Sequence, residues 1–386
     1  MIHYLTLAGR VMFSEYLDYW GRDLADAKVR ILRYEKLLNE THFERGTYVF
    51  SAIEEVAPPM ERFIHELALR LGENPGVRLF NDPQRVLRRF ELHAELWRLG
   101  RSGFRSVRAA GDLSGLRYPL FIRSERSHDG ALSPLLHSQH EAETWIGRAI
   151  ALGRPLHDLM VVEFCETADA GGWYRKYAAF NVGGRIVPRS MNYGRHWMLK
   201  FAGNEFSMAM AEEELEYVQR NPHEQELAEI FTIARTDYGR IDYSIKDGRV
   251  QPWEINLNPT IGRGLRPSSR FIEPELRGIR ERTKETFYAR FNEAWAAVET
   301  GDIDRTPFAI RLDPAIVAAA RVDATRRWRT GSALIAAGVR LVKPLMKTPL
   351  RPLLRMLYRL PKRLVHANAA SLFRLLGKRA RQKRVE

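Results

Sequence analysis

Cysteine is nearly absent from this chain, which has one among its 386 residues. A single thiol excludes an internal disulfide framework and suits a reducing compartment. The first ten residues lack the basic start and long apolar stretch of a secretory signal. No apolar run approaches the ~20 residues that a membrane-spanning helix needs. The sequence therefore predicts a cytoplasmic protein, with peripheral attachment to the inner face of the membrane left open.

An even spread of charge is also missing. The net charge is +14, yet residues 321–386 contain 18 Lys/Arg against 2 Asp/Glu. Residues 1–320 keep 43 basic and 45 acidic side chains, a net charge of −2. With 45% hydrophobic residues, this near-neutral body is long enough for two or more domains with real cores.

Residues 238–262 are the most informative stretch, because two runs alternate polar and apolar residues around Asp247-Gly248. Period-two alternation around a glycine turn predicts a β-hairpin with one core face. Carboxylate and amide oxygens without Cys or His are what Mg²⁺ prefers, and they would gather on the other face. The alternative is a solvated hairpin with ordinary surface residues. The polar positions are Arg240, Asp242, Ser244, Glu254, Asn256 and Asn258.

The register of this hairpin decides whether its carboxylates meet. A two-residue turn would pair Asp242 with Trp253 and leave Glu254 on the opposite side of the sheet, because a one-residue shift reverses the faces. We therefore predict a three-residue loop over 246–248 with left-handed Gly248, or an equivalent bulge. Pro252 cannot donate a ladder bond, which also indicates a bulge or an edge strand.

The run Glu254-Ile255-Asn256-x-Asn258-Pro259, preceded by Arg240-Ile241-Asp242, resembles the metal-binding hairpin of the ATP-grasp ligases. The resemblance implies that Asp242, Glu254 and Asn256 hold Mg²⁺, or Mn²⁺ in its place. It also implies that Arg240 neutralises the transferring phosphoryl group. The charge pattern agrees, since phosphoryl transfer depends chiefly on positioning and on charge stabilisation by metal and Arg.

Four upstream segments continue the resemblance in the family's order. Met160–Cys165 is similar to the adenine-binding strand and hinge, and Trp173–Pro188 to the next hairpin, with a Gly183-Gly184 turn. Tyr118–Arg123 is similar to a strand that usually ends in an ATP-binding Lys, and the glycine-poor loop Ser124–Gly130 would close over the phosphates. Asn81-Asp82-Pro83 opens a helix whose Arg89 replaces another Lys, and Arg keeps the charge but changes reach and geometry. The resemblance implies ATP contacts by Arg89, Arg123, Ser127, His128, Glu163, Phe164, Cys165, Glu166 and Lys176.

Structural roles compete with several of these assignments. Cys165 fits an apolar position in a buried strand. Arg89 belongs to a basic cluster with Arg85 and Arg88 that suits a solvated helix face, and His128 fits a loop without a role. Weaker candidates for substrate binding are Arg175, Arg195, Lys200 and Asn258. Arg195 and Lys200 also fit a packed surface loop.

The fold class expected is α/β with α+β lobes. By resemblance it is an ATP-grasp fold with an N-terminal α/β pre-domain (1–80), a small lobe (81–158), a large lobe (159–300), a linker (301–320) and a basic helical tail (321–386). Aromatic residues at 287, 291 and 295 predict a core stripe on the last long helix. A strand is expected at Gly46–Ser51, and helices at Leu24–Glu40, Pro59–Leu71, Pro83–Leu99, Gln139–Leu152, Glu212–Arg220, Pro222–Thr236 and Ile272–Glu299.

The tail repeats basic residues every four positions among leucines, with prolines between short helices. Such a segment favours an anionic membrane surface, ahead of an acidic protein partner or self-association. Nucleic acid is less favoured, because no recognised nucleic-acid module appears, and a solvated tail remains open.

The function predicted is an ATP-dependent ligase that joins a small-molecule or peptide carboxylate to an amine, or to a thiol, through an acyl phosphate. One alternative is a catalytically silent ATP-binding regulator or scaffold, docked on an anionic membrane or acidic partner by the tail. Another is an acidic-polymer-binding protein with a structural body. The Arg-for-Lys positions motivate the first alternative.

Overall fold

The computed structural model describes residues 1–25, 29–127, 130–199, 205, 207–262, 274–298 and 306–325. The chain divides into two compact units, residues 1–312 and 313–386. The described part of the second unit contains a helix over 314–325. His128, Lys200 and the tail from 326 onward lie outside the described residues.

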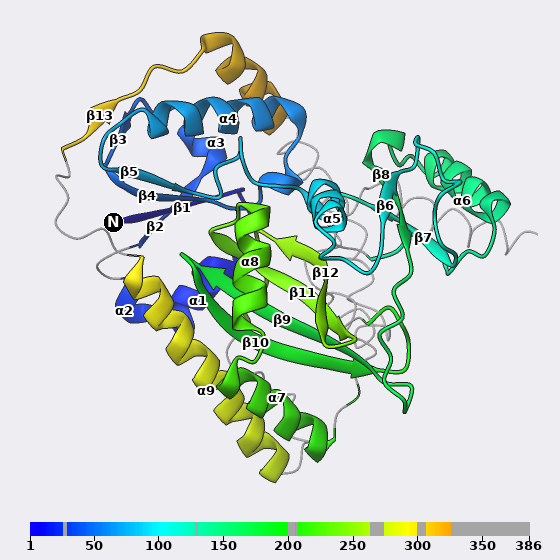
Figure 1. The fold of residues 1–386 in the computed structure, drawn as a ribbon. Helices are drawn as coiled ribbons and strands as arrows, with labels where there is room; N and C mark the ends of the chain where they lie inside the picture. Colours follow the sequence, from blue (N-terminus) through cyan, green and yellow to red (C-terminus); the bar gives the residue numbers. More distant parts are fainter. Residues whose placement is uncertain are drawn as a thin grey trace, which may run out of the picture. The chain divides into compact units, whose positions relative to one another are not determined.

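The first sheet is wholly parallel and confirms the α/β class (Figure 1). Its order is β2-β1-β4-β5, and β1 and β4 are buried along their whole length. Helices α1 (Met12–Tyr19), α3 (Tyr34–Leu37) and α4 (Pro58–Gly72) lie between its strands along the chain. The predicted strand at 46–51 and helix at 59–71 are confirmed. The strands are β1 (Ile2–Thr6), β2 (Val29–Arg33), β4 (Gly46–Phe50) and β5 (Val77–Phe80).

Two predicted helices are wrong in part. Within 24–40, the described residues form the end of α2 (Arg22–Ala25), then β2 and α3, because β2 pairs in parallel with β1 and tertiary pairing overrides helix propensity. Helix α5 spans Arg89–Arg98 and not 83–99. The amide of Leu87 donates to the Ala234 carbonyl at 3.0 Å, which draws residues 86–88 out of a helical path.

The second sheet is antiparallel, in the order β6-β8-β7. Helix α6 (Gln139–Ala151) packs on it, and Leu120, Ile122, Ile146 and Val161 share one core. The predicted strand within 160–165 is therefore present. The strands are β6 (Ser106–Arg108), β7 (Leu120–Ser124) and β8 (Leu159–Glu163).

The third sheet is antiparallel, in the order β10-β9-β11-β12. Strands β9 (Tyr174–Val182) and β10 (Arg185–Gly194) turn at Gly183-Gly184, where both φ angles are positive, as predicted. Helices α7 (Met208–Arg220), α8 (Glu224–Ala234) and α9 (Pro274–Ala297) accompany the sheet (Figure 1). Phe287, Phe291 and Trp295 on α9 are fully buried, which confirms the core stripe.

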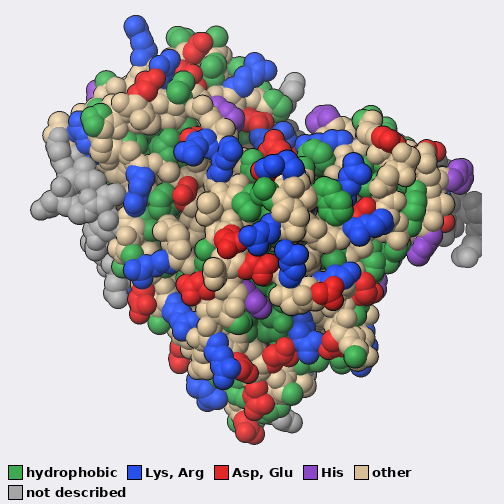
Figure 2. Space-filling view, viewed as in Figure 1, with side chains coloured by type: hydrophobic (Ala, Val, Ile, Leu, Met, Phe, Trp, Pro, Cys, Tyr) green, Lys and Arg blue, Asp and Glu red, His purple; other side chains and the backbone are tan. Residues whose placement is uncertain are grey.

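Two short strands, β3 (His42–Phe43) and β13 (Phe308–Ala309), form a separate antiparallel pair. Among the described residues, no helix combines the length and the apolar character that crossing a bilayer requires. Acidic and basic side chains are interspersed over the face in Figure 2, as the near-neutral charge of residues 1–320 leads one to expect.

Candidate functional site

The register of the hairpin formed by β11 (Tyr238–Lys246) and β12 (Arg249–Asn256) brings its polar residues together. The turn has two residues, Asp247 (φ 50°) and Gly248 (φ 73°), so the three-residue loop is wrong. The bulge alternative is right, because the register shifts between Asp242 and Tyr243 and leaves Trp253 as the extra residue.

The bulge places Asp242 directly opposite Glu254, and Arg240 opposite Asn256. Opposed residues of an antiparallel pair share a face, so both carboxylates lie on one side. Strand β12 is an edge strand of the sheet, which is where its Pro252 is tolerated. The sequence prediction of one polar face on this hairpin is confirmed.

Asp242 is buried and accepts hydrogen bonds from two cations. Arg240 Nε donates to its Oδ1 at 2.8 Å, and Lys176 Nζ, from β9, donates to its Oδ2 at 3.1 Å. Burial lowers the pKa of Arg240, but the charge and hydrogen bond of Asp242 outweigh it and hold that pKa above its ordinary value. Arg240 therefore carries its charge at neutral pH.

Glu254 is held in the same way by two arginines, from β7 and α5. Arg123 Nη2, on β7, donates to Glu254 Oε2 at 2.9 Å, and Arg89 Nη2, at the start of α5, donates to the same oxygen. The side chains of Arg89, Arg123 and Glu254 are only 5%, 10% and 15% exposed. Burial, and then the charge of Arg89, lower the pKa of Arg123 to about 10, so Arg123 still carries its charge at neutral pH.

Together these side chains form a group that we call the cation cluster: Arg89, Arg123, Lys176, Arg240, Asp242 and Glu254. It holds four positive and two negative charges. Arg123 Nε is buried and has no hydrogen-bond partner among the described residues. Excess buried charge and an unused buried donor are both costly. The cluster is therefore suited to a polyanion.

Arg89 also organises the loop after β7. Its Nη1 donates to the carbonyl oxygens of Ser124, Glu125 and Ser127 at 2.9, 2.7 and 2.9 Å. The solvated helix position that sequence reasoning allowed for Arg89 is wrong, because its side chain is buried. The described part of the predicted phosphate loop thus lies against the cation cluster, and Ser127 reaches it through its backbone.

Other predicted ATP ligands have structural partners. The buried Glu163 carboxylate accepts from the amides of Arg105 and Arg117 and from the Arg117 guanidinium, at 2.6–3.1 Å. Glu166 accepts from the amide of Ala168 and the hydroxyl of Tyr174. Cys165 is buried, as the apolar interpretation expected.

Phe164 lies in a half-buried aromatic group with Trp197 and Phe121. The ring centroids of Phe164 and Trp197 are 5.8 Å apart, and those of Trp197 and Phe121 are 5.1 Å apart. These rings come from β7 and from the segments after β8 and β10. Such a group suits the flat face of a base.

Two of the weaker substrate candidates, Arg175 and Arg195, have partners away from the cation cluster. Arg175 neighbours Lys176 on β9 and so faces the opposite side, where it pairs with Asp169 and Glu213. Arg195 lies over the Trp173 ring, 4.1 Å from its centroid.

Asn258 does stay near the hairpin end. Its amide nitrogen donates to Asn256 Oδ1 at 2.8 Å, and its side-chain Nδ2 donates to Glu55 Oε1 at 3.2 Å.

Sequence reasoning missed His93, on α5. Its Nδ1 lies 2.9 Å from Ser106 Oγ and its Nε2 lies 3.1 Å from the carbonyl oxygen of Trp253, the bulge residue. Burial, and then the charges of Arg123 and Arg89, lower its pKa to about 3. A neutral imidazole therefore fastens the bulge to α5 and β6, and a lone His in an amphipathic helix gives no signal of this.

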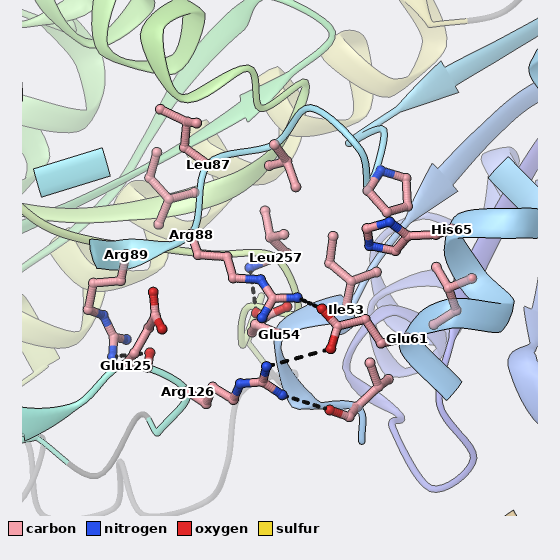
Figure 3. A pocket seen from close by; sticks show the side chains of 15 residues that line it. Ile53, Glu54, Glu61, His65, Leu87, Arg88, Arg89, Glu125, Arg126 and Leu257 are labelled. Carbon is pink, nitrogen blue, oxygen red and sulfur yellow. Dashed lines mark hydrogen bonds and ion pairs between the residues drawn. The ribbon is translucent and has the colours of Figure 1, made fainter. Parts of the chain in front are cut away.

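A small pocket next to the cation cluster was also not foreseen (Figure 3). It lies among residues 53–65, the start of α5, the loop after β7 and the end of β12. Arg88 and Arg126 approach Glu61 of α4 from two separate segments within it. Arg89, a member of the cation cluster, also lines this pocket.

The donors predicted to bind metal fit Mg²⁺ in their chemistry. Asp242, Glu254 and Asn256 offer two carboxylates and one amide oxygen on adjacent strands, and Mg²⁺ is usually held by one or two carboxylates plus substrate phosphates. Within the described ranges, no three His, Cys, Asp or Glu side chains cluster as an all-protein metal site would require. The set therefore suits a metal that arrives with phosphate.

Comparisons with known proteins give structural neighbours only. No family model and no curated protein matches the chain. A D-alanine–D-alanine ligase from Bacillus anthracis is similar at 12% identity and TM-score 0.40, over 76% of this chain and 98% of that one. The ATP-grasp ligase PsnB with a minimal precursor is similar at 11% identity and TM-score 0.44, over 77% of this chain and 99% of that one. A RimK domain ATP-grasp protein from Sphaerobacter thermophilus is similar at 15% identity and TM-score 0.42, over 75% of this chain and 98% of that one. TM-scores this low say nothing about reaction or substrate, so the function is inferred from the residues of the site.

Proposed function

We propose that this protein is an ATP-dependent, ATP-grasp-type ligase that activates a carboxylate as an acyl phosphate and transfers the acyl group to an amine. The observation that carries the proposal is the hairpin register, which sets Asp242 opposite Glu254. Two carboxylates on one face, surrounded by four cationic side chains, are the groups that a magnesium–triphosphate complex needs.

The residues divide into three roles in this proposal. Asp242, Glu254 and Asn256 would hold Mg²⁺, which supplies charge neutralisation to the phosphate oxygens. Lys176, Arg89 and Arg123 would bind the phosphates, and Arg240 would stabilise the transferring phosphoryl group. Nucleotide binding would then replace the contacts between carboxylates and cations. Each carboxylate would contact the metal, and each cation would contact phosphate.

The chemistry balances with ATP, a carboxylate and an amine. A carboxylate oxygen bonds to the γ-phosphorus, and the bond to the β,γ-bridging oxygen breaks, so that ADP leaves with its electron pair. The amine nitrogen then bonds to the acyl carbon, the carbon–oxygen bond to phosphate breaks, and the amine proton passes to solvent. Protein groups position the reactants and stabilise the phosphoryl charge.

Two measurements on the full chain test this function. Nucleotide affinity measured with and without Mg²⁺ should rise with the metal in the wild type, and the Asp242→Asn/Glu254→Gln double variant should lose that rise. ADP release should depend on a carboxylate and an amine supplied together. If magnesium improves ATP affinity equally in both proteins, the metal assignment is wrong.

A silent ATP-binding regulator is the second candidate, and one observation favours it. Each proposed metal carboxylate already holds two cations of the same chain, an arrangement that also serves a stable binding module. Magnesium-dependent ATP binding without ADP formation across a broad carboxylate and amine screen would select this candidate. ADP formation with any pair would eliminate it.

A further inference from the structure

The pocket beside the cation cluster already contains a carboxylate of the protein itself. Arg126 Nη2 lies 3.5 Å from Glu61 Oε2, and Arg88 Nη2 contacts the other oxygen, Glu61 Oε1. Arg88, Arg126 and Glu61 are 28%, 31% and 22% exposed at their side chains. Two guanidinium groups therefore converge on one carboxylate at a position that solvent can reach (Figure 3).

The other acidic groups of the pocket have partners outside the Arg88–Glu61–Arg126 group. Glu125 accepts two hydrogen bonds from Arg108, at 2.6 and 3.1 Å. Glu54 accepts from the Leu257 amide at 3.0 Å. Burial lowers the pKa of His65, so its imidazole is neutral at neutral pH. The Arg88–Glu61–Arg126 group, which we call the pocket triad, by itself carries one net positive charge.

The rest of the lining is mainly aliphatic. Ile53 and Ile64 come from the N-terminal part, Leu87 precedes α5, and Leu257 follows β12. Aliphatic walls around a few convergent polar groups are typical of small-molecule sites. A ligand with a small apolar part fits these walls, and its single negative charge fits the pocket triad.

Two consecutive arginines connect this pocket to the cation cluster. Arg88 is the residue before α5 and contacts Glu61, whereas Arg89 is its first residue and contacts Glu254. The helix start therefore gives one guanidinium group to each site, and Arg89 also lines the pocket. A carboxylate bound at Arg88 would thus share the pocket wall with Arg89, to which the proposed function assigns phosphate.

We propose that the pocket binds the carboxylate substrate, a small monocarboxylate with an aliphatic body, and that Glu61 occupies the carboxylate position until the substrate displaces it. The role of this carboxylate as the substrate rests on the proposed function, whereas carboxylate binding by the pocket does not. Charge-assisted hydrogen bonds from two arginines supply the recognition. The aliphatic walls select against dicarboxylates and polar acids.

The test is calorimetric or NMR binding of isovalerate and 4-methylpentanoate to the full chain without nucleotide. Arg88→Gln and Arg126→Gln should each weaken binding about tenfold, the loss of one charge-assisted hydrogen bond. Glu61→Gln should tighten it several-fold, because the internal competitor is gone. Arg70 lies on the same helix as Glu61 but pairs with Glu66 and Glu73. Arg70→Gln is therefore the matched control and should change nothing.

The outcomes separate this inference from the proposed function. Preferential binding of isopentylamine, weaker isovalerate binding in Glu61→Gln, or an unchanged affinity in folded Arg88→Gln and Arg126→Gln would overturn the pocket assignment. Should carboxylates bind as expected while ATP does not, the pocket stands and the ligase proposal fails. Should ATP be turned over with carboxylates that ignore all three pocket variants, the ligase stands and the pocket assignment fails.

Discussion

Glu254→Gln gives the sharpest prediction, because it should raise the affinity for metal-free ATP while lowering the free energy of unfolding. The carboxylate accepts from Arg89 and Arg123 on a single oxygen, and all three side chains are at most 15% exposed. An amide removes the negative charge and leaves two buried guanidinium groups without it. The cation cluster changes from four positive and two negative charges to four positive and one negative.

The magnitude follows from the burial. Two unit charges in contact near 4 Å interact by about 4 kcal/mol at an effective dielectric constant of 20, and removing one partner of a buried pair typically costs 3–5 kcal/mol. We expect the variant without ligand to lose about 3 kcal/mol of unfolding free energy. With the internal competitor gone, ATP in EDTA should bind about tenfold more tightly, and Mg²⁺ should no longer improve that affinity.

Urea denaturation and calorimetric ATP titration, in EDTA and in Mg²⁺, measure both effects. Inorganic sulfate should restore part of the lost stability of the variant, because it supplies the missing anion. Glu229→Gln is the control, since its pair with Arg101 is 43–44% exposed and exposed pairs contribute less than about 1 kcal/mol. A folded Glu254→Gln protein whose ATP affinity in EDTA is unchanged or lower would refute the exchange of carboxylate for phosphate.

Three further predictions concern the support of the site. His93→Phe leaves Ser106 Oγ and the Trp253 carbonyl without their buried partner, and urea denaturation at pH 7 should show a loss of about 1–3 kcal/mol. His93 and His3 have folded pKa values of about 3 and about 4, below the unfolded value of 6.5. The unfolded state therefore binds more protons below pH 6.5. The free energy of unfolding should fall as the pH drops from 6.5 to 4, by up to about 1.4 kcal/mol per pH unit for each group. A His3→Phe/His93→Phe variant with an unchanged slope of stability against pH would contradict this. Phe291→Ala empties a fully buried position on α9 and should cost about 3–5 kcal/mol, whereas Leu152→Ala, at 66% exposure, should stay within about 0.5 kcal/mol of the wild type.

The hairpin shows how far sequence pattern reaches. Alternation assigned the faces of residues 240–245 and 253–258, and the need for Asp242 to meet Glu254 predicted an irregularity in the register. The pattern did not locate the irregularity. Its place at Trp253 depends on the His93 contact and on the packing of the Trp253 ring against Phe104, which are distant in sequence.

Long-range pairing explains the other differences. Residues 29–33 have a charged and apolar pattern that also fits a helix, and only the neighbouring β1 makes them a strand. Glu163 looked available for a nucleotide because nothing in the sequence connects it with Arg117, forty-six residues earlier. Arg88 and Arg89 looked like one basic patch, and the turn into α5 sends their side chains to different sites.

The arginine at position 89 has a physical reason in this fold. One guanidinium reaches three backbone carbonyls of the loop after β7 and also Glu254. An ammonium has three donors on a single atom, whereas a guanidinium spreads five over a rigid plane, so only Arg spans all four acceptors. The loop is poor in glycine, and a side chain that holds its carbonyls supplies order that the backbone alone would not. Arg89 therefore couples the loop to the cation cluster, and any anion that draws Arg89 away from Glu254 also acts on the loop that would cover that anion.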